Sequence, residues 1–108
     1  MTCTDLPESV VEKLCAIFRE YPSISRVLLY GSRAMRTCRA NSDIDLTIEA
    51  DSMSLSDLLA IENRVDNLLL PWKVDLSLRH KIDNPGLQEH IERVGVTFYP
   101  VGDDRLEI

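Results

Sequence analysis

The chain has 108 residues, 44% of them hydrophobic, which fits one globular domain over residues 1–108 and leaves little room for a second, substrate-binding domain. Its formal net charge of −6 argues against a nucleic-acid-binding protein, because such proteins present a basic face to the phosphates. The three cysteines include no C-x-x-C pair and are odd in number, which argues against a disulfide framework and a zinc site.

The N-terminal sequence supports two predictions, a cytoplasmic location and a helix as the first element. Residues 1–10 contain neither the basic nor the apolar segment of a signal peptide, and no apolar run in the chain approaches the ~20 residues that span a bilayer. Residues 7–21 favour a helix, because apolar side chains recur there at helical spacing. These side chains are Val10, Leu14, Ile17, Phe18 and Tyr21. Cys15 lies among them and is expected to be a small core residue.

Three short strands are predicted from the apolar residues that follow. Residues 26–30 (RVLLY) form the first strand, and Gly31 ends it. In residues 43–50 (DIDLTIEA) and 73–78 (KVDLSL), apolar and polar residues alternate, which is typical of strands with one buried and one polar face. The apolar positions are Ile44, Leu46, Ile48, Val74, Leu76 and Leu78.

Two further helices connect and follow these strands. One is predicted over residues 54–70, where Ser54 can cap the N-terminus, and one begins at Asn84-Pro85. Because the first of them links the second and third strands, we expect these strands to be parallel neighbours joined by a right-handed crossover. Since each strand has one apolar face, we expect the helices to cover one side of the sheet and the other side to be polar and open.

Three aspartates are predicted to gather on the polar side of this sheet. Asp43 and Asp45 are two positions apart on one strand and therefore point the same way, and Asp75 occupies the polar face of the neighbouring strand. Clustered carboxylates repel one another unless a cation lies between them. Two Mg²⁺ ions, with Mn²⁺ as an alternative, would relieve that repulsion. Such a metal pair is typical of sites for in-line displacement at phosphorus.

Gly31 and Ser32 are candidates for holding a phosphate group. They directly follow the first strand and precede a segment that can begin a short helix. Glycine lets the backbone approach a phosphate closely, and the N–H groups of a helix start favour an anion. Arg33 either pairs with phosphate or lies in solvent. Arg36 and Arg39 either belong to a solvated loop or contact a nucleotide or a partner.

Each motif has a simpler interpretation when it stands alone. Asp-x-Asp on a strand is commonly a solvated face, and Gly-Ser is commonly a turn. In this chain, however, the two motifs occur together with a third aspartate, and each occupies the position in the strand order that phosphate chemistry needs. The combination favours a functional site over a solvated surface.

The stretch GSRAMRTCRANSDIDL, residues 31–46, resembles the signature of the minimal nucleotidyltransferases (MNT) of the DNA polymerase beta superfamily. That signature is Gly-Ser, about ten residues, Asp-x-Asp and a third acidic residue on a later strand; ten residues separate Ser32 from Asp43 here. The resemblance covers most of the chain. It implies an α/β (α+β) single-domain nucleotidyltransferase fold, with a small mixed sheet and helices packed on one face. It also implies a metal-dependent enzyme that transfers a nucleoside monophosphate, AMP above all, from an NTP to an acceptor hydroxyl.

The resemblance divides the candidate residues into two groups. The nucleotide-binding group, which would hold the triphosphate of ATP, consists of Gly31, Ser32 and Arg33. The metal-binding and catalytic group consists of Asp43, Asp45 and Asp75. Within it, Asp43 and Asp45 would bind both metal ions. Asp75 would bind the metal nearest the acceptor and help to take its proton.

Small proteins of this type resemble the antitoxin halves of HEPN/MNT toxin–antitoxin pairs, in which some members attach AMP to a tyrosine of an all-helical HEPN partner. We therefore expect an antitoxin that forms a hetero-oligomer with a HEPN-type acceptor protein, without membrane or direct nucleic-acid contact. Two alternatives stay open. One is a catalytically idle module that neutralises its partner sterically. The other is a transferase that acts on a small molecule in a pocket supplied by the partner.

Overall fold

Helices and strands alternate along the part of the chain that the structure describes. The structure is a computed structural model and describes residues 6–35 and 43–100. In chain order the elements are α1 (Glu8–Arg19), β1 (Ile24–Tyr30), α2 (Ser32–Met35), β2 (Ile44–Ala50), α3 (Leu55–Asp66), β3 (Val74–Leu78), the 3₁₀ turn η1 (Arg79–Lys81), α4 (Pro85–Val94) and β4 (Val96–Tyr99). Every helix and strand predicted from the sequence is present. Ser54 caps α3 as expected, because its side chain accepts a hydrogen bond from the Asp57 N–H.

The four strands form one mixed sheet in the order β3–β2–β1–β4, which confirms the predicted fold class. The strands β2 and β3 are parallel neighbours, as the helix between them predicted. The strand β1 is antiparallel to both β2 and β4. In this register Asp45 lies opposite Asp75 on one side and opposite Tyr30 on the other. We refer to Tyr30, Asp45 and Asp75 as the Asp45 row.

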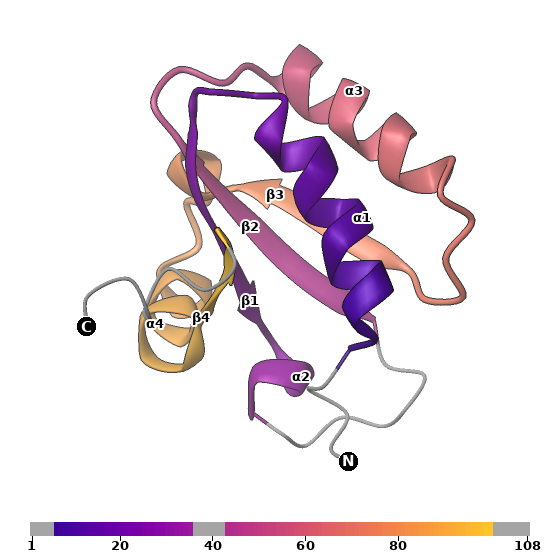
Figure 1. Ribbon diagram of the computed structural model, residues 1–108. Helices are drawn as coiled ribbons and strands as arrows, with labels where there is room; N and C mark the ends of the chain where they lie inside the picture. Colours follow the sequence, from indigo (N-terminus) through magenta and orange to yellow (C-terminus); the bar gives the residue numbers. More distant parts are fainter. Residues whose placement is uncertain (1–5, 36–42, 101–108) are drawn as a thin grey trace, which may run out of the picture.

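The helices α1 and α3 pack on one face of the sheet and enclose the main hydrophobic core (Figure 1). The strand residues that face these helices are buried; they are Val27, Leu29, Ile44, Leu46, Ile48, Leu76 and Leu78. Cys15 of α1 is 1% exposed, which confirms its predicted place in the core. Phe18 of α1 contacts Phe98 of β4 edge-on, with ring centroids 6.4 Å apart. The main core therefore contains side chains from both helices and from all four strands.

The opposite face is polar over β2 and β3 but is covered by α4 beside β1. Leu28 and Tyr30, which alternate with the core-facing residues of β1, pack against Ile91 and Leu87 of α4. The prediction that helices pack on one face thus holds for α1 and α3, while α4 packs on the second face. The reason is that residues 27–30 of β1 are apolar at both sets of alternate positions, so this half of the strand offers an apolar surface to helices on both sides.

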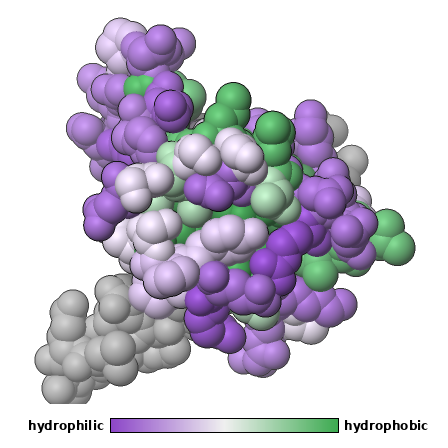
Figure 2. Space-filling view, turned by 90° about the horizontal axis from the view of Figure 1, so that it is seen from above, coloured by the Kyte–Doolittle hydropathy of each residue, from purple (hydrophilic) through white to green (hydrophobic). Residues whose placement is uncertain are grey.

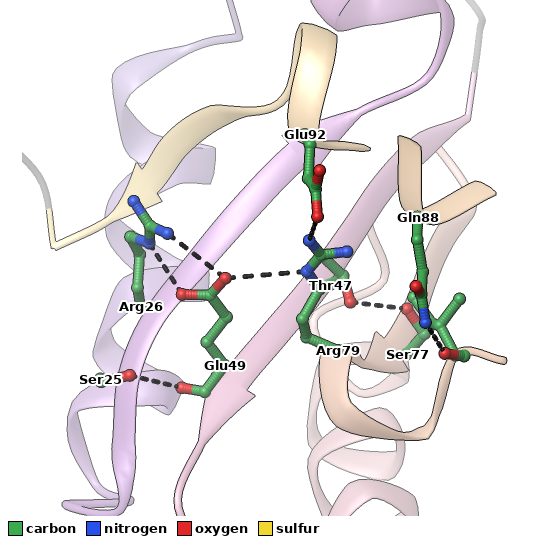
Figure 3. A network of polar contacts seen from close by, with 9 residues as sticks. Ser25, Arg26, Thr47, Glu49, Ser77, Arg79, Gln88 and Glu92 are labelled. Atoms are coloured by element: carbon green, nitrogen blue, oxygen red, sulfur yellow. Dashed lines mark hydrogen bonds and ion pairs between the residues drawn. The ribbon is translucent and has the colours of Figure 1, made fainter. Parts of the chain in front are cut away.

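A polar network joins α4 to the sheet at the end of the second face remote from Asp45 (Figure 3). Arg26 of β1 donates from Nε to Glu49 Oε1 of β2 over 2.9 Å. Arg79 lies between two carboxylates, with its Nε 3.8 Å from Glu49 Oε2 and its Nη2 3.4 Å from Glu92 Oε2 of α4. These contacts lie at the edge of the second face, whereas the packing of Ile91 against Leu28 and Tyr30 holds α4 over it.

The surface of the described residues is mixed in character. Figure 2 shows hydrophilic residues on the face seen from above, with smaller groups of hydrophobic residues among them. The large apolar side chains that remain exposed in this part of the chain are Leu55, Leu59, Leu69 and Val96. Within residues 6–35 and 43–100, no helix has both the length and the apolar composition that crossing a bilayer requires.

Candidate functional site

Asp45 lies on the polar face between side chains from both neighbouring strands. Its register partners are Asp75 of β3 and Tyr30 of β1. Asp43 directly precedes β2 and is exposed, as is Asp75, whereas Asp45 is half-buried. The structure therefore brings Asp45 and Asp75 side by side, as the sequence predicted, with Asp43 two residues before Asp45 at the start of the strand.

The surroundings of Asp45 disfavour its ionised form. Burial is the main reason why the pKa of Asp45 is raised above its ordinary value, and the charges of Asp75 and Asp43 raise it further. The positive charge of His90 in its protonated form and that of Arg33 act in the opposite sense, because a positive charge favours the ionised carboxylate. Asp45 is thus an acid whose ionised form is disfavoured by burial and by its two neighbouring aspartates.

The donors at this position suit a hard divalent cation. Carboxylate oxygens are preferred ligands of Mg²⁺ and Mn²⁺, and a cation would offset the repulsion that raises the pKa of Asp45. Among the described residues, no three Asp, Glu, His or Cys side chains are gathered tightly enough to hold an ion. The fit therefore rests on the chemistry of the donors and on their mutual repulsion, and not on a preformed cage.

Gly31 is packed directly against the Asp45 carboxylate. Its φ of 77° lies in the left-handed region that favours glycine. A Cβ atom at this position would collide with Asp45 Oδ2. Ser32 follows as the first residue of α2 and is half-buried. The Gly-Ser turn and Asp45 therefore form one contiguous unit, although the sequence motif separates them by more than ten residues.

His90 of α4 reaches the same turn, and the sequence analysis did not single it out. Its Nε2 accepts a hydrogen bond from the Gly31 N–H over 3.2 Å. Its ring lies edge-on to Tyr30, with ring centroids 6.3 Å apart. The sequence did contain a signal, because Leu87, His90 and Ile91 follow the i, i+3, i+4 spacing of one helix side. His90 therefore shares the side of α4 that packs on the sheet.

Arg33 is buried, which contradicts the interpretation that it lies in solvent. Its side chain is 2% exposed, and its Cζ lies 5.7 Å from the centroid of the Trp72 ring. Burial lowers the pKa of Arg33, whereas the charges of Asp43 and Asp45 raise it. The guanidinium thus lies inside the site, over the Trp72 ring and within the electrostatic influence of two carboxylates. The other two arginines of this segment, Arg36 and Arg39, lie outside the described residues.

Hydroxyl groups line the polar face next to the Asp45 row. Ser77 Oγ donates to Thr47 Oγ1 over 3.0 Å (Figure 3). Burial is the main reason why the pKa of Tyr30 is raised; Asp45 and Asp75 raise it further, and a hydrogen bond with Ser77 opposes them. The phenol of Tyr30 is therefore a neutral hydroxyl beside the aspartates over the range where proteins function.

Comparisons with known proteins identify relatives along most of the chain. The family model described as Polymerase beta, Nucleotidyltransferase matches residues 12–101. A relative from Methanocaldococcus jannaschii, named as protein adenylyltransferase MJ1217, is 32% identical over 92 residues, which cover 84% of this chain and 92% of that protein. A second one from the same organism, named as protein adenylyltransferase MJ0126, is 33% identical over 75 residues, covering 68% of this chain and 76% of that protein.

Several solved structures share the fold. A chain from the crystal structure of a toxin–antitoxin with AMP-PNP has a TM-score of 0.67 and 23% identity, covering 89% of this chain and 78% of its own. A chain from the MntA–HepT toxin–antitoxin has a TM-score of 0.65 and 19% identity. The match covers 91% of this chain and 76% of that chain. A third similar chain comes from the structure of a tri-AMPylated Shewanella oneidensis HEPN toxin in complex with MNT antitoxin. It has a TM-score of 0.65 and 18% identity, and the match covers 91% of this chain and 76% of that chain. At these identities the likeness shows the fold.

Proposed function

The chain belongs to the Polymerase beta nucleotidyltransferase family, and from this premise we propose that it transfers AMP from ATP to a hydroxyl group of a HEPN-type partner protein and so acts as an antitoxin. The observation that carries the proposal is the contact between the Gly31 turn and Asp45, with Asp75 on the adjacent strand. Phosphoryl-type transfer depends on positioning and on charge neutralisation, which a phosphate-binding turn beside clustered carboxylates supplies.

In this proposal, residues 1–108 form one nucleotidyltransferase domain with two groups of site residues. Gly31, Ser32 and Arg33 bind the triphosphate, and Asp43, Asp45 and Asp75 would hold two Mg²⁺ ions, or Mn²⁺ in their place. The bound metal neutralises negative charge on the phosphates. Asp75 takes the proton of the acceptor hydroxyl while the hydroxyl oxygen bonds to the α-phosphorus of ATP and pyrophosphate leaves.

Two observations favour an acceptor delivered by another protein. Asp75 is exposed and lies on β3, which is an edge strand of the sheet, so an acceptor can approach it from outside. The named relatives are protein adenylyltransferases, and the similar structures include an AMPylated HEPN toxin bound to an MNT antitoxin. The same comparisons support AMP as the transferred unit. A cytoplasmic location is part of this proposal.

A labelling experiment tests the proposal. The chain is incubated with the proposed HEPN-type partner, labelled ATP and Mg²⁺, and mass spectrometry locates the added AMP. We expect label on a tyrosine, serine or threonine of the partner. Asp75→Asn should abolish labelling while the complex still assembles, because Asp75 is assigned to the chemistry. Asp51→Asn is the control. It makes the same change at an exposed residue that directly follows β2, at the end of the strand away from Asp43 and Asp45, and this variant should label the partner normally.

Two outcomes would overturn parts of this account. If the wild type forms the complex but labels nothing with any of the four NTPs, the chain is a binding module that neutralises its partner sterically. If Asp75→Asn also prevents assembly of the complex, the catalytic face and the docking surface are not separate.

A further inference from the structure

His90 connects α4 to the turn that the proposed function assigns to phosphate binding. Its Nε2 accepts the Gly31 N–H at 3.2 Å, although 59 residues separate the two along the chain. Its ring packs edge-on against Tyr30, with an interplanar angle of 78°. One side chain of α4 thus contacts both the turn and Tyr30, a member of the Asp45 row.

Gly31 is enclosed from two sides. Asp45 Oδ2 occupies the space that a Cβ atom of residue 31 would need, and His90 holds the N–H of the same residue. The φ of 77° requires a conformation that most residues avoid. The direction of the backbone into Ser32 and α2 therefore depends on a hydrogen bond that Gly31 donates to an acceptor on α4.

We propose that His90 is a positioning residue, which holds the Gly31 turn against Asp45 and thereby sets the affinity of the site for Mg²⁺–ATP. This inference rests on the proposed function, since ATP is its ligand. His90 acts through the Gly31 N–H and is not assigned to the reacting atoms. The hydrogen bond also fixes the form of the ring: because Nε2 accepts, the neutral imidazole carries its proton on Nδ1.

Removing the hydrogen bond should weaken nucleotide binding more than it changes the chemical step. The half-buried N–H of Gly31 would lose its acceptor and turn toward another partner, which displaces the turn. We expect the Kd for ATP in the presence of Mg²⁺ to rise roughly five- to tenfold, the size expected for one hydrogen bond. The KM for ATP should rise by a similar factor, with a smaller change in kcat.

Two substitutions separate the hydrogen bond from the packing. His90→Gln places an acceptor oxygen near the position of Nε2 but removes the ring, whereas His90→Phe keeps a ring beside Tyr30 but has no acceptor. His80→Ala changes the other histidine of the chain, which is exposed on η1, and serves as the control. Calorimetric titration with ATP and Mg²⁺ should give near wild-type affinity for His90→Gln and His80→Ala and weaker affinity for His90→Phe. The reverse order for the two His90 variants would overturn the proposal in favour of ring packing.

A measurement without nucleotide keeps the test independent of the proposed function. The sequence has only four glycines, so the Gly31 amide can be assigned readily in a ¹⁵N–¹H spectrum. We expect its hydrogen exchange to be slow in the wild type and in His90→Gln and faster in His90→Phe, and the nitrogen shifts of His90 to report a proton on Nδ1. A fast-exchanging Gly31 amide or an Nε2-protonated ring in the wild type would overturn the role of His90. If the amide behaves as expected but the wild type binds no nucleotide, the proposed function fails and the claim that His90 sets ATP affinity fails with it.

Discussion

Side chains of β2 and β3 point alternately toward α1 and α3 and toward the second face, and the two sets differ in burial and in charge. On the first face Ile44, Leu46 and Ile48 are 0% exposed and apolar. On the second face Asp45 is half-buried and Asp75 exposed, and the pKa of Asp45 is raised by burial and by the charge of Asp75. Adjacent residues of one strand therefore have different roles: one packs in the core and stabilises the fold, and the next belongs to the candidate functional site. Substitutions on the first face should lower stability, and those on the second should lower function.

The largest loss of stability is expected on the first face. Leu46→Ala removes buried methyl groups from a fully enclosed site and should lower the free energy of unfolding by about 2–5 kcal/mol. Urea unfolding followed by circular dichroism measures this loss. Leu59→Ala makes the same change where the side chain is 57% exposed and should cost far less. Equal losses in the two variants would mean that the first face is not a closed core.

Gly31→Ala should affect both stability and nucleotide binding. A side chain in the left-handed region costs about 1–2 kcal/mol, and the added Cβ must displace the Asp45 carboxylate. Gly86→Ala is the matched control, since a Cβ there meets only the Asn84 side chain, at 3.3 Å. Thermal unfolding and ATP titration should show losses in the first variant only. Unchanged ATP affinity in Gly31→Ala would contradict the role of the turn.

Asp45→Asn should leave the metal-free fold as stable as the wild type, or slightly more so. Because the pKa of Asp45 is raised in the folded chain, the folded chain binds this proton more tightly than the unfolded chain does. Ionisation of Asp45 therefore costs stability. The cost is absent well below the unfolded pKa of about 3.9 and complete above the raised folded pKa.

Urea unfolding in EDTA at several pH values measures this effect. As the pH rises through that window, the wild type should lose stability relative to Asp45→Asn. A large drop in the melting temperature of Asp45→Asn in EDTA would instead show that Asp45 has a structural role.

The smallest effect is expected at the exposed edge of the second face. Glu92→Gln weakens the 3.4 Å contact between Glu92 and Arg79, but the Glu92 side chain is 70% exposed. Exposed ion pairs contribute between zero and about 1 kcal/mol, so the free energy of unfolding should change by less than that. Chemical denaturation at low and at high salt tests this expectation, and a loss approaching that of Leu46→Ala would mean that the network holds α4 in place.

Local patterns were sufficient to predict the two faces of β2 and β3. The alternation of apolar and polar residues predicted which side chains face the core, and the helix between the strands predicted that they are parallel neighbours. Together these features predicted that Asp45 and Asp75 lie side by side, as the register confirms. The roles of these residues in metal binding and catalysis remain predictions.

The contacts that the sequence did not reveal all depend on how distant elements pack. The apolar side of α4 could in principle pack on either face of the sheet. It packs on the second face because Leu28 and Tyr30 of β1 offer apolar side chains there. His90 reaches Gly31 as a consequence of that packing. The burial of Arg33 likewise depends on Trp72, which belongs to the connection that precedes β3. No spacing rule within one segment contains this information.

Calorimetric titration of Mg²⁺ or Mn²⁺ with and without ATP tests the central claim most directly. That claim is that the second face carries a metal and nucleotide site at Asp43 and Asp45. We expect weak metal binding to the chain alone and tighter binding with ATP, because the phosphates complete the coordination shell. The double variant Asp43→Asn plus Asp45→Asn should bind neither metal nor the metal–ATP pair above background. Metal and ATP binding that stays unchanged in the double variant would contradict the assignment of the site.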